Sequence, residues 1–457
     1  MVRLPHRRMN RLFGVATSII LLGLIFGSIG LQSARVRGHI PYLNAPAPTP
    51  KPAGVVLRLD QLPAPDVANA AAPVVSTPEP TAQTVAAVVE TPAATEAPTA
   101  TIAPTILPVS SATVAATSTP APTVAPTATA VPATPTTAPT PQPQAIPPAV
   151  FLEPMDHWYQ TWNNCAGVTT AMTLSYFGIK ADPLVLSPIF RPNANDKHVE
   201  SYQVTEYLHT QGLKAETYEG GTVDRIKRLI AVGAPVIVAQ WQNRTDHAGI
   251  GHYRVVRGYD DAKGAFLMND SMEGPSVAIK YTEFDDLWSL YDYRYIPVWN
   301  DKLDPAVRRV LGDDMDPKVN LPRAIRYMQG RIEQQPGNAE LWFGLGGGYF
   351  RMGDYQKAVD NYHKAVSLGL MKKTPWTIWY QFWPVTALVN VGLDDEALAT
   401  AQENINSAKA FGEMHYERGR VFEKRGDMTT AKREYQMALV DDKNFKDAQK
   451  AVARLGG

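Results

Sequence analysis

The stretch YQTWNNCAGVTTAMTLSYFG, residues 159–178, joins a polar and aromatic loop to a run with helical spacing. A helix is predicted to open at Cys165, directly after QTWNN, and Gly178 is a natural stop for it. The side chains expected on one face of this helix are Val168, Ala171, Met172 and Ser175. Cys165 is thus predicted at the amino terminus of a helix that packs on the rest of a domain.

This position suits a reactive thiol. A helix amino terminus carries partial positive charge and free N–H groups, which lower the pKa of a thiol and can later bind an oxyanion. Gln160, five residues before Cys165, could supply a second oxyanion donor through its side-chain amide. The pattern therefore makes Cys165 a candidate nucleophile, whereas a cysteine without such context is most often a small buried hydrophobic residue.

Strands are predicted after this helix. The apolar runs are PVIVAQW at 235–241, HYRVVRGY at 252–259, AFLMN at 265–269 and RYIPVW at 294–299. The turn DDAKG, residues 260–264, joins the second and third runs as a hairpin, and VDRIKRLIAVG at 223–233 is a second amphipathic helix. Helices followed by an antiparallel sheet predict an α+β domain over residues 151–300.

The predicted sheet supplies two partners for the thiol. His252 begins a strand and is the candidate base, and Asp270 at the end of the hairpin could orient its imidazole. Asn269 is a rival for the orienting role, because strand alternation lets only one of the two neighbours face the histidine. A zinc site using His247, His252 and Cys165 is formally conceivable, but no paired metal-ligand spacing occurs, so neither a metal nor a cofactor is expected.

These residues resemble the bacteriocin-processing, papain-like cysteine peptidases (the double-glycine leader peptidases, family C39), in particular their stand-alone extracytoplasmic branch. The matching stretches are YQTWNNC, AMTLSYFG, GAPVIVAQW, GHYRVVRGYDD and NDS, in the order of the family. The resemblance implies a papain-like fold with Cys165 as nucleophile, His252 as general base and acid, Asp270 as orienting acid and Gln160 as oxyanion donor.

The resemblance also implies a hydrolase that cleaves peptide or protein substrates without a cofactor. The sequence departs from the family at Ala166 and Gly167, where Gly-Pro usually follows the cysteine, and at Ser271, where proline is common. Two other functions therefore stay open. One is a weak or inactive peptidase-like module that binds peptides, and the other is a scaffold whose helical domain recruits a partner.

The amino-terminal segment predicts a membrane anchor. Basic residues concentrate in residues 1–11, and residues 12–31 carry no charge over about 30 Å of helix, the thickness of the hydrocarbon core. Because the basic residues precede the uncharged run, the amino terminus is expected in the cytoplasm of a bacterial-type cell. The folded domains are then expected outside the cell, held by a single-pass membrane anchor. The alternative is a cleaved signal peptide and a secreted protein.

Residues 44–148 consist largely of Pro, Ala, Thr and Val. Such a segment cannot bury enough apolar area to offset its ordering entropy, so a disordered linker is predicted. Its length of about 105 residues would let it act as a stalk that crosses a cell wall.

Residues 318–457 form a predicted all-α repeat domain that resembles the tetratricopeptide repeat (TPR). Glycines recur at 353, 392 and 426, and each is followed five residues later by alanine. The stretch LPRAIRYMQGRIEQQP, residues 321–336, is a half repeat expected to cap the stack, and the middle unit has a five-residue excess near KKTPW at 372–376. Such repeats predict binding of a protein partner or coverage of the peptidase domain.

Composition limits the remaining possibilities. Lysine plus arginine equals aspartate plus glutamate at 44 each, so no global field attracts nucleic acid, and no nucleic-acid partner is expected. With a single cysteine in the chain, an intramolecular disulfide is impossible. Stability must therefore come from packed cores.

Overall fold

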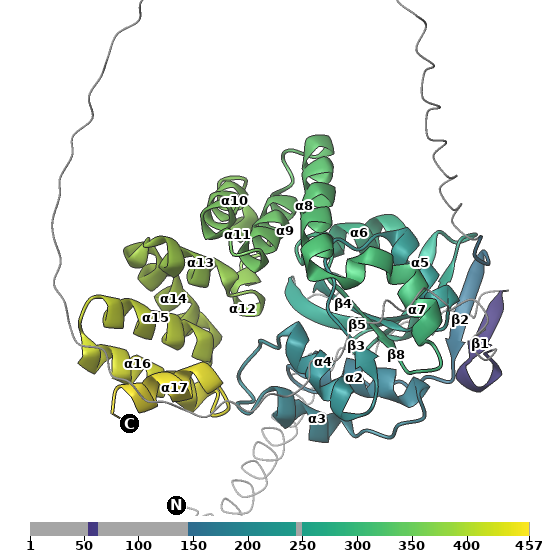
Figure 1. Ribbon diagram of the computed structural model, residues 1–457, viewed down its shortest axis with the longest axis horizontal. Helices are drawn as coiled ribbons and strands as arrows, with labels where there is room; N and C mark the ends of the chain where they lie inside the picture. The colour runs from purple at the N-terminus through teal and green to yellow at the C-terminus, as the bar shows by residue number, and fades with distance from the viewer. Residues whose placement is uncertain (1–53, 63–144, 244–248, 457) are drawn as a thin grey trace, which may run out of the picture. The chain divides into compact units, whose positions relative to one another are not determined.

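The computed structural model describes residues 54–62, 145–243 and 249–456. An eight-stranded sheet forms the first part of this region, and helices cover it (Figure 1). The strands are β1 (Val55–Arg58), β2 (Ala149–Glu153), β3 (Lys214–Ala215), β4 (Val236–Gln242), β5 (Ile250–Asp260), β6 (Ala265–Asp270), β7 (Gly274–Lys280) and β8 (Tyr295–Trp299). The helices are α2 (Cys165–Tyr176), α3 (Pro183–Phe190), α4 (Ser201–Thr210), α5 (Val223–Ala231) and α6 (Tyr281–Ser289).

Strand β5 is the centre of the sheet. The main order is β1-β2-β5-β4-β8-β3, while β6 pairs with β5 and β7 with β6. The first part of β5 pairs antiparallel with β4, which puts His252 opposite Gln240, and its last residues pair with β2 and β6. The predicted strands and hairpin are confirmed in β4, β5, β6 and β8.

The predicted helix at Cys165 is present as α2, but it is buried on more than one face. All residues from Ala166 to Leu174 are buried, because β5 packs on one side of α2 and α3 and α4 pack on the other. The threonines that would make a polar face bond to backbone instead: the Thr169 hydroxyl donates to the carbonyl of Tyr253 on β5 at 3.0 Å, and Thr173 donates to the carbonyl of Thr169. The helix is therefore fixed against the strand that carries His252.

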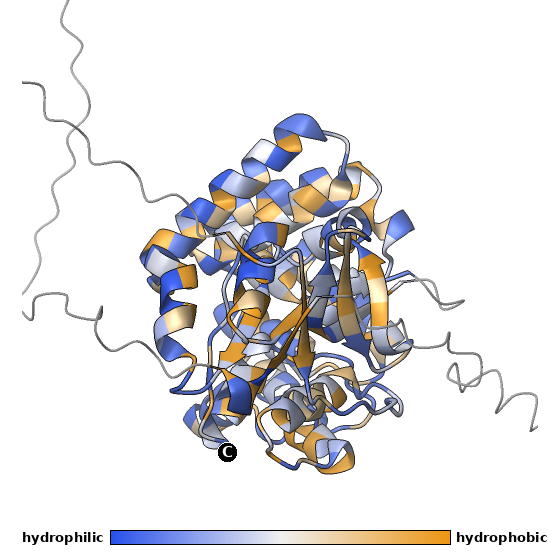
Figure 2. Ribbon diagram, turned by 90° about the vertical axis from the view of Figure 1, so that its right-hand side faces the viewer, coloured by the Kyte–Doolittle hydropathy of each residue, from blue (hydrophilic) through white to orange (hydrophobic). Residues whose placement is uncertain are grey.

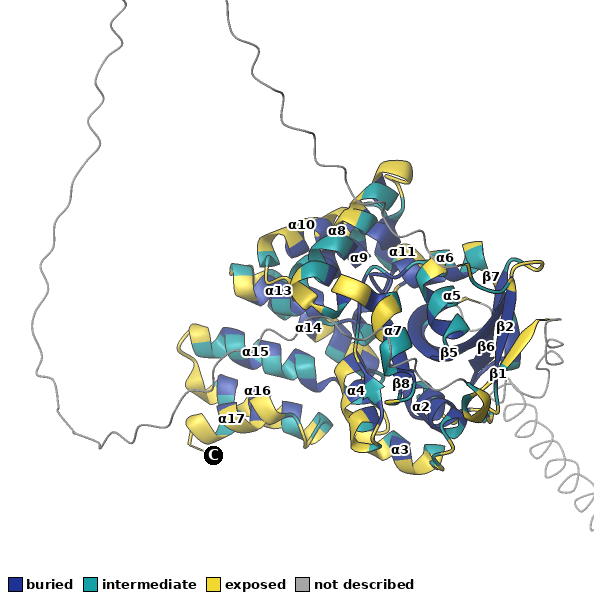
Figure 3. Cartoon of the chain, turned by 45° about the vertical axis from the view of Figure 1, so that its right-hand side comes forward, coloured by how far each residue is buried: buried dark blue, intermediate teal, exposed yellow. Residues whose placement is uncertain are grey.

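Part of the predicted linker is ordered, which corrects the assignment of residues 44–148. Residues 55–58 form β1, an exposed edge strand that pairs in parallel with β2, and residues 59–61 form a short 3-10 helix (Figure 3). The carbonyl of Leu59 accepts a hydrogen bond from the Lys302 side chain, and Leu62 packs against the core. The apolar side chains of VVLRL, residues 55–59, explain this pairing, since a short β-branched run can add to an open sheet edge.

The repeat region follows α7 (Asp304–Leu311) and is helical throughout the described residues. Paired helices stack in order, as α9 with α10, α13 with α14 and α15 with α16. Along these helices hydrophilic and hydrophobic residues alternate, and several strands carry hydrophobic stretches (Figure 2). The helices are α8 (Pro317–Gln334), α9 (Ala339–Arg351), α10 (Tyr355–Ser367), α11 (Leu370–Lys373), α12 (Thr377–Tyr380), α13 (Trp383–Val391), α14 (Asp394–Ala408), α15 (Gly412–Lys424), α16 (Met428–Asp441) and α17 (Lys446–Arg454).

The five-residue excess in the middle repeat has a structural counterpart. It lies where two one-turn helices, α11 and α12, interrupt the pairing between α10 and α13. The half repeat predicted at 321–336 lies in α8, which packs on α9. Small residues do allow close packing, since a Cβ at Gly346 would lie 2.5 Å from the ring of Trp383.

The repeats pack directly on the peptidase-like domain. A single apolar core contains residues of both, from Val150 in β2 to Val421 in α15. A Cβ at Gly344 of α9 would lie 2.4 Å from the carbonyl oxygen of Ser289, which ends α6. Arg331 of α8 pairs with Asp285 of α6 at 2.5 Å. This contact area fixes the first repeats against the sheet domain.

The predicted membrane segment at 12–31 lies outside the described residues, as does most of the linker. Within residues 54–62, 145–243 and 249–456, no helix combines the length and apolar character that a membrane span requires.

Candidate active site

Cys165 is the first residue of α2, and it is partly exposed. The preceding Asn164 starts the helix, because its carbonyl accepts the N–H of Val168 at 3.1 Å. The Asn164 side chain donates to the carbonyl of Pro183 at 3.2 Å, which ties the start of α2 to the start of α3. The thiol therefore occupies the positive end of a helix whose position is fixed on both sides.

Gly167 leaves the space that this arrangement needs. A Cβ at position 167 would lie 2.6 Å from Oδ1 of Asn164 and 3.3 Å from the backbone nitrogen of Ser187 in α3. The helix begins at Cys165 although the sequence after it is Ala166-Gly167, and Ala166 is buried in the core. Close packing between α2 and α3 thus favours glycine at position 167.

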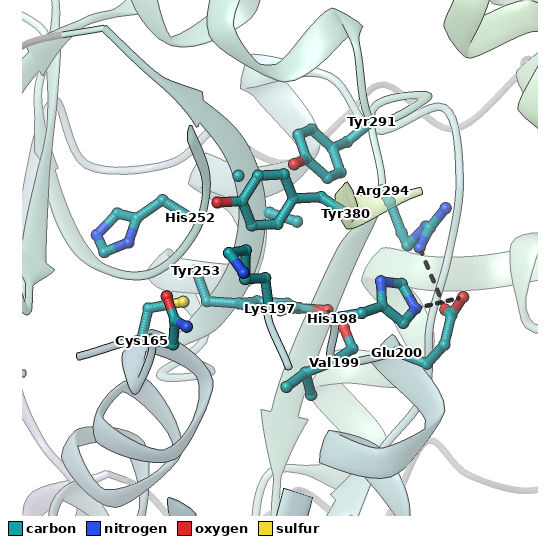
Figure 4. Close-up of a pocket in the computed structure, with 13 residues that line it drawn as sticks. Cys165, Lys197, His198, Val199, Glu200, His252, Tyr253, Tyr291, Arg294 and Tyr380 are labelled. Atoms are coloured by element: carbon teal, nitrogen blue, oxygen red, sulfur yellow. Dashed lines mark hydrogen bonds and ion pairs between the residues drawn. The ribbon is translucent and has the colours of Figure 1, made fainter. Parts of the chain in front are cut away.

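His252 lies on β5 with a fully buried imidazole. Its Nε2 bonds to Oδ1 of Asp270 at 2.9 Å, while its Nδ1 makes no hydrogen bond to the described residues within normal geometry. In Figure 4 the ring lies above the sulfur of Cys165. Burial alone lowers the pKa of His252, but the charge and hydrogen bond of Asp270 and the interaction with Cys165 raise it to about 9.

The same interaction acts on the thiol. Burial by itself raises the pKa of Cys165, but the facing His252, the backbone N–H of Tyr253 and the charge of Arg191 lower it further than burial raises it. The net pKa of Cys165 lies below its ordinary value. A lowered thiol pKa next to a raised imidazole pKa favours a thiolate–imidazolium pair.

Asp270 is the acid that faces His252, and Asn269 points elsewhere. The Asn269 side chain accepts from Arg257 at 3.2 Å and donates to the carbonyl of Asp156 at 3.0 Å. Burial alone raises the pKa of Asp270, but the charges of His252 and Arg254 and their hydrogen bonds hold it well below its usual range. The carboxylate therefore stays ionised beside the imidazole.

Arg254 is the residue of this site that the sequence reasoning missed. Its Nε donates to Oδ2 of Asp270 at 2.5 Å, and its two terminal nitrogens donate to the side-chain oxygens of Gln240 at 3.1 Å and Gln242 at 2.6 Å. The side chains of Arg254 and Asp270 are both fully buried. Arg254 lies two residues after His252, so strand alternation places both on one face, and an arginine buried there requires a carboxylate.

Gln160 is buried and held by Ser271. Its side-chain oxygen accepts from the Ser271 hydroxyl at 2.7 Å, and its backbone N–H donates to the carbonyl of Ser271 at 2.9 Å. This bond fixes the amide with its NH₂ group on the side away from Ser271. Ser271, which replaces a common proline of the family, therefore positions the residue predicted as an oxyanion donor.

A small cavity lies beside Cys165 and His252. Its volume is about 30 Å³, which is room for about two water molecules. The peptidase-like domain lines it with Lys197, His198 and Glu200, and the repeat domain contributes Tyr380 from α12 (Figure 4). The space at the thiol is thus closed partly by a residue of the repeats, which the sequence did not indicate.

Substitution of Gly251 tests the close packing of Tyr291 and Tyr380 at this cavity. A Cβ at position 251 would lie 2.2 Å from the Tyr291 hydroxyl and 2.5 Å from Cγ of Tyr380. Gly251→Ala is therefore expected to lower the free energy of unfolding by about 1–3 kcal/mol, as overpacking of a close contact does. Urea unfolding of the full-length protein measures this. Gly330→Ala in α8, where an added Cβ meets nothing within 4 Å, is the matched control; equal stability of the two variants would contradict the contact.

Among the residues that the structure describes, no group of three or more His, Cys, Asp or Glu could hold a metal ion. His247, one member of the zinc alternative, lies outside the described residues.

A helix that opens with a cysteine and packs on an antiparallel sheet with a histidine and an acid is the arrangement of papain-like cysteine peptidase domains. Residues 149–296 match the model of the peptidase C39 like family, and residues 339–369 match the tetratricopeptide repeat. The predicted combination of a C39-like peptidase domain with TPR repeats is therefore confirmed.

Solved structures with partial similarity include proteins of both kinds. One is a putative C39-like peptidase from Bacillus anthracis, with 16% identity over 33% of this chain and 96% of that chain, at a TM-score of 0.27. Another is a double glycine motif protease from an AMS/PCAT transporter in complex with the leader peptide, with 17% identity over 33% and 94%, at 0.26. A third is MamA from Desulfovibrio magneticus RS-1, with 17% identity over 30% and 75%, at 0.27. No curated protein matches the chain.

Proposed function

We propose that this protein is a cysteine peptidase that hydrolyses peptide bonds through Cys165, His252 and Asp270. The observation that carries the proposal is the buried His252–Asp270 pair at 2.9 Å, with the free ring nitrogen of His252 on the side of a thiol whose pKa is lowered. The second ring nitrogen of His252 interacts with the Cys165 thiol, so it is placed to exchange a proton with it. The match to the peptidase C39 like family supports the same function.

In the proposed mechanism, the Cys165 thiolate attacks the carbonyl carbon of the scissile bond and a C–S bond forms. The backbone N–H of Cys165 and the side-chain amide of Gln160 stabilise the oxyanion. The imidazolium of His252 gives its proton to the leaving amine as the C–N bond breaks. Water then attacks the thioester while His252 takes a proton from it. The C–S bond breaks, the acid product leaves, and the thiolate–imidazolium pair is restored.

The pKa values define the pH range of this mechanism. The ion pair needs a pH above the lowered pKa of Cys165, so that the thiol is ionised, and below about 9, so that His252 keeps its proton. We therefore expect hydrolysis to fall on the alkaline side as pH rises through about 9.

The proposal also includes a cellular setting. The 20 uncharged residues at 12–31 support a membrane anchor with the folded domains outside the cytoplasm. The repeats support a protein or peptide partner. YrrB, a structural neighbour with 20% identity, is described as a TPR protein with an unusual peptide-binding site, which is a property of that protein.

The test is the pH dependence of alkylation of full-length protein by iodoacetamide, compared with His252→Ala. Cys165 is the only cysteine, so the rate reports on this thiol alone. We expect an apparent thiol pKa below the ordinary value of about 8.5. In His252→Ala the pKa should rise by one unit or more, which lowers the thiolate fraction about tenfold at pH values below both pKa values.

His209→Ala on α4 is the matched control, because His209 is partly exposed and its Nε2 bonds only to the backbone and a surface glutamate. This variant should keep the profile of the unsubstituted protein. A Cys165 thiol whose pKa is ordinary and does not change in His252→Ala would contradict the proposed peptidase function. The domain would then be a peptide-binding module, or a support for a scaffold made by the repeats.

A further inference from the structure

Two cavities of the described residues share a wall. The first is the cavity of about 30 Å³ beside Cys165, and the second, of about 240 Å³, lies between the peptidase-like domain and the repeats. Glu200, Arg294 and Tyr380 line both. The second cavity, called the shared groove below, therefore adjoins the space at the thiol across these three residues.

Tyr380 forms the boundary between the two cavities. It ends α12, and its ring packs on the backbone of Gly251, next to His252, and edge to face on Trp241 with the centroids 6.2 Å apart. The following residue, Gln381, donates through Nε2 to the carbonyl of Leu290 at 2.9 Å, which anchors this corner of the repeats to the peptidase-like domain. In Figure 4 the hydroxyl of Tyr380 points to the side of His252.

The charged groups of the shared groove are paired within the protein. Arg294 lies 3.4 Å from Asp292 and 3.9 Å from Glu200. Arg351 bonds to Glu219 at 2.9 Å and also pairs with Asp292. Because these cations already have carboxylate partners, the groove offers no free charge that would select a charged ligand.

What the groove offers instead is aromatic surface. Tyr202 on α4 is 58% exposed, and Phe350 and Phe382 from the repeats are partly exposed. Trp383 completes the lining. Aromatic surface that is open to solvent and flanked by neutral ion pairs favours an apolar side chain.

We propose that the shared groove is a substrate subsite that binds an apolar side chain of the same extended peptide whose scissile bond lies at Cys165. The inference rests on the proposed peptidase function. Because the groove lies directly across Tyr380 from the thiol, an extended peptide that passes Tyr380 reaches a groove built by both domains. The repeat domain then selects substrates as part of the site.

The experiment digests a proteome-derived peptide library with the full-length protein and identifies the cleavage sites by mass spectrometry. The variants are Phe382→Ala and Tyr202→Glu, and Val440→Ala, whose side chain is 69% exposed on α16, is the matched control. We expect the unsubstituted protein and the control to prefer an apolar residue at one position away from the cleaved bond. Both groove variants should lose this preference, with kcat/KM for the best peptide about 10-fold lower, mainly through KM.

The rate of iodoacetamide alkylation of Cys165 is the second readout, and it should be the same in all four proteins. Phe382 also packs on His198, with the ring centroids 5.1 Å apart. If Phe382→Ala does not fold for this reason, Tyr202→Glu alone tests the subsite. If the unsubstituted protein cleaves the library and Tyr202→Glu cleaves it with the same profile, the subsite is overturned and the proposed peptidase function stands. An unreactive Cys165 and no cleavage by the unsubstituted protein overturn both.

Discussion

Arg254→Met is expected to lower the free energy of unfolding by about 3–5 kcal/mol, the usual effect of breaking a buried ion pair by removing one partner. The substitution keeps the apolar volume of the side chain but removes every donor that the guanidinium supplies. Asp270 would stay charged and buried with His252 as its remaining cationic partner. The side-chain oxygens of Gln240 and Gln242 would lose their bonds to Arg254 at 3.1 Å and 2.6 Å. Urea unfolding of the full-length protein measures the loss.

Arg425→Met is the matched control for this experiment. Arg425 pairs with Asp395 at 2.7 Å on the surface, where the aspartate is 95% exposed, so its loss should change stability by less than about 1 kcal/mol. If Arg254→Met were as mild as this control, the buried network would not hold the site together, and Asp270 would have to be stabilised by its other contacts alone.

Asp270→Asn is expected to lower peptide hydrolysis by about 10³–10⁴-fold, the order of effect seen when the acid of a catalytic triad becomes an amide. Asparagine cannot supply the negative charge that raises the pKa of His252 to about 9. Burial, then opposed only by the interaction with Cys165, lowers that pKa, so we expect a neutral imidazole at neutral pH. Without an imidazolium beside it, Cys165 loses the charge that holds its own pKa down.

Two measurements separate this effect from unfolding. Thermal unfolding establishes that Asp270→Asn is folded at the assay temperature, and iodoacetamide alkylation at pH 7 should be slower than in the unsubstituted protein. Asp261→Asn is the control, because Asp261 lies in the β5–β6 turn and bonds to Lys227 and Tyr281 on the surface. Hydrolysis by Asp270→Asn within tenfold of this control would exclude Asp270 from the mechanism.

The parts of the site that the sequence predicted are those set by local pattern. Cys165 at a helix start, His252 on a strand and Asp270 at a hairpin end all follow from neighbouring residues. The choice between Asn269 and Asp270 could not be made in this way, because the ladder between β5 and β6 shifts register near its end and only the three-dimensional pairing settles which side chain faces the histidine.

The parts that the sequence did not predict depend on contacts between distant segments. Arg254 bonds to two glutamines on β4, and the local sequence HYRVVRGY does not indicate these partners. Tyr380 comes from an irregular corner of a repeat more than 120 positions from His252, so periodicity could not place it at the site. The ordered residues 55–61 were hidden because a five-residue run with four apolar side chains barely changes the composition of a segment of about 105 residues.

The pairing of β1 with β2 changes the topology of the proposed tether. Since residues 55–58 and 149–153 are neighbouring strands, the Pro/Ala/Thr-rich chain between them leaves the domain and returns to it. Its length adds nothing to the distance between a membrane and the peptidase. If residues 12–31 form the anchor, only residues 32–53 connect it to β1, and these 22 residues span at most about 75 Å. The peptidase-like domain would then lie within that distance of the bilayer, whatever the length of the Pro/Ala/Thr-rich segment.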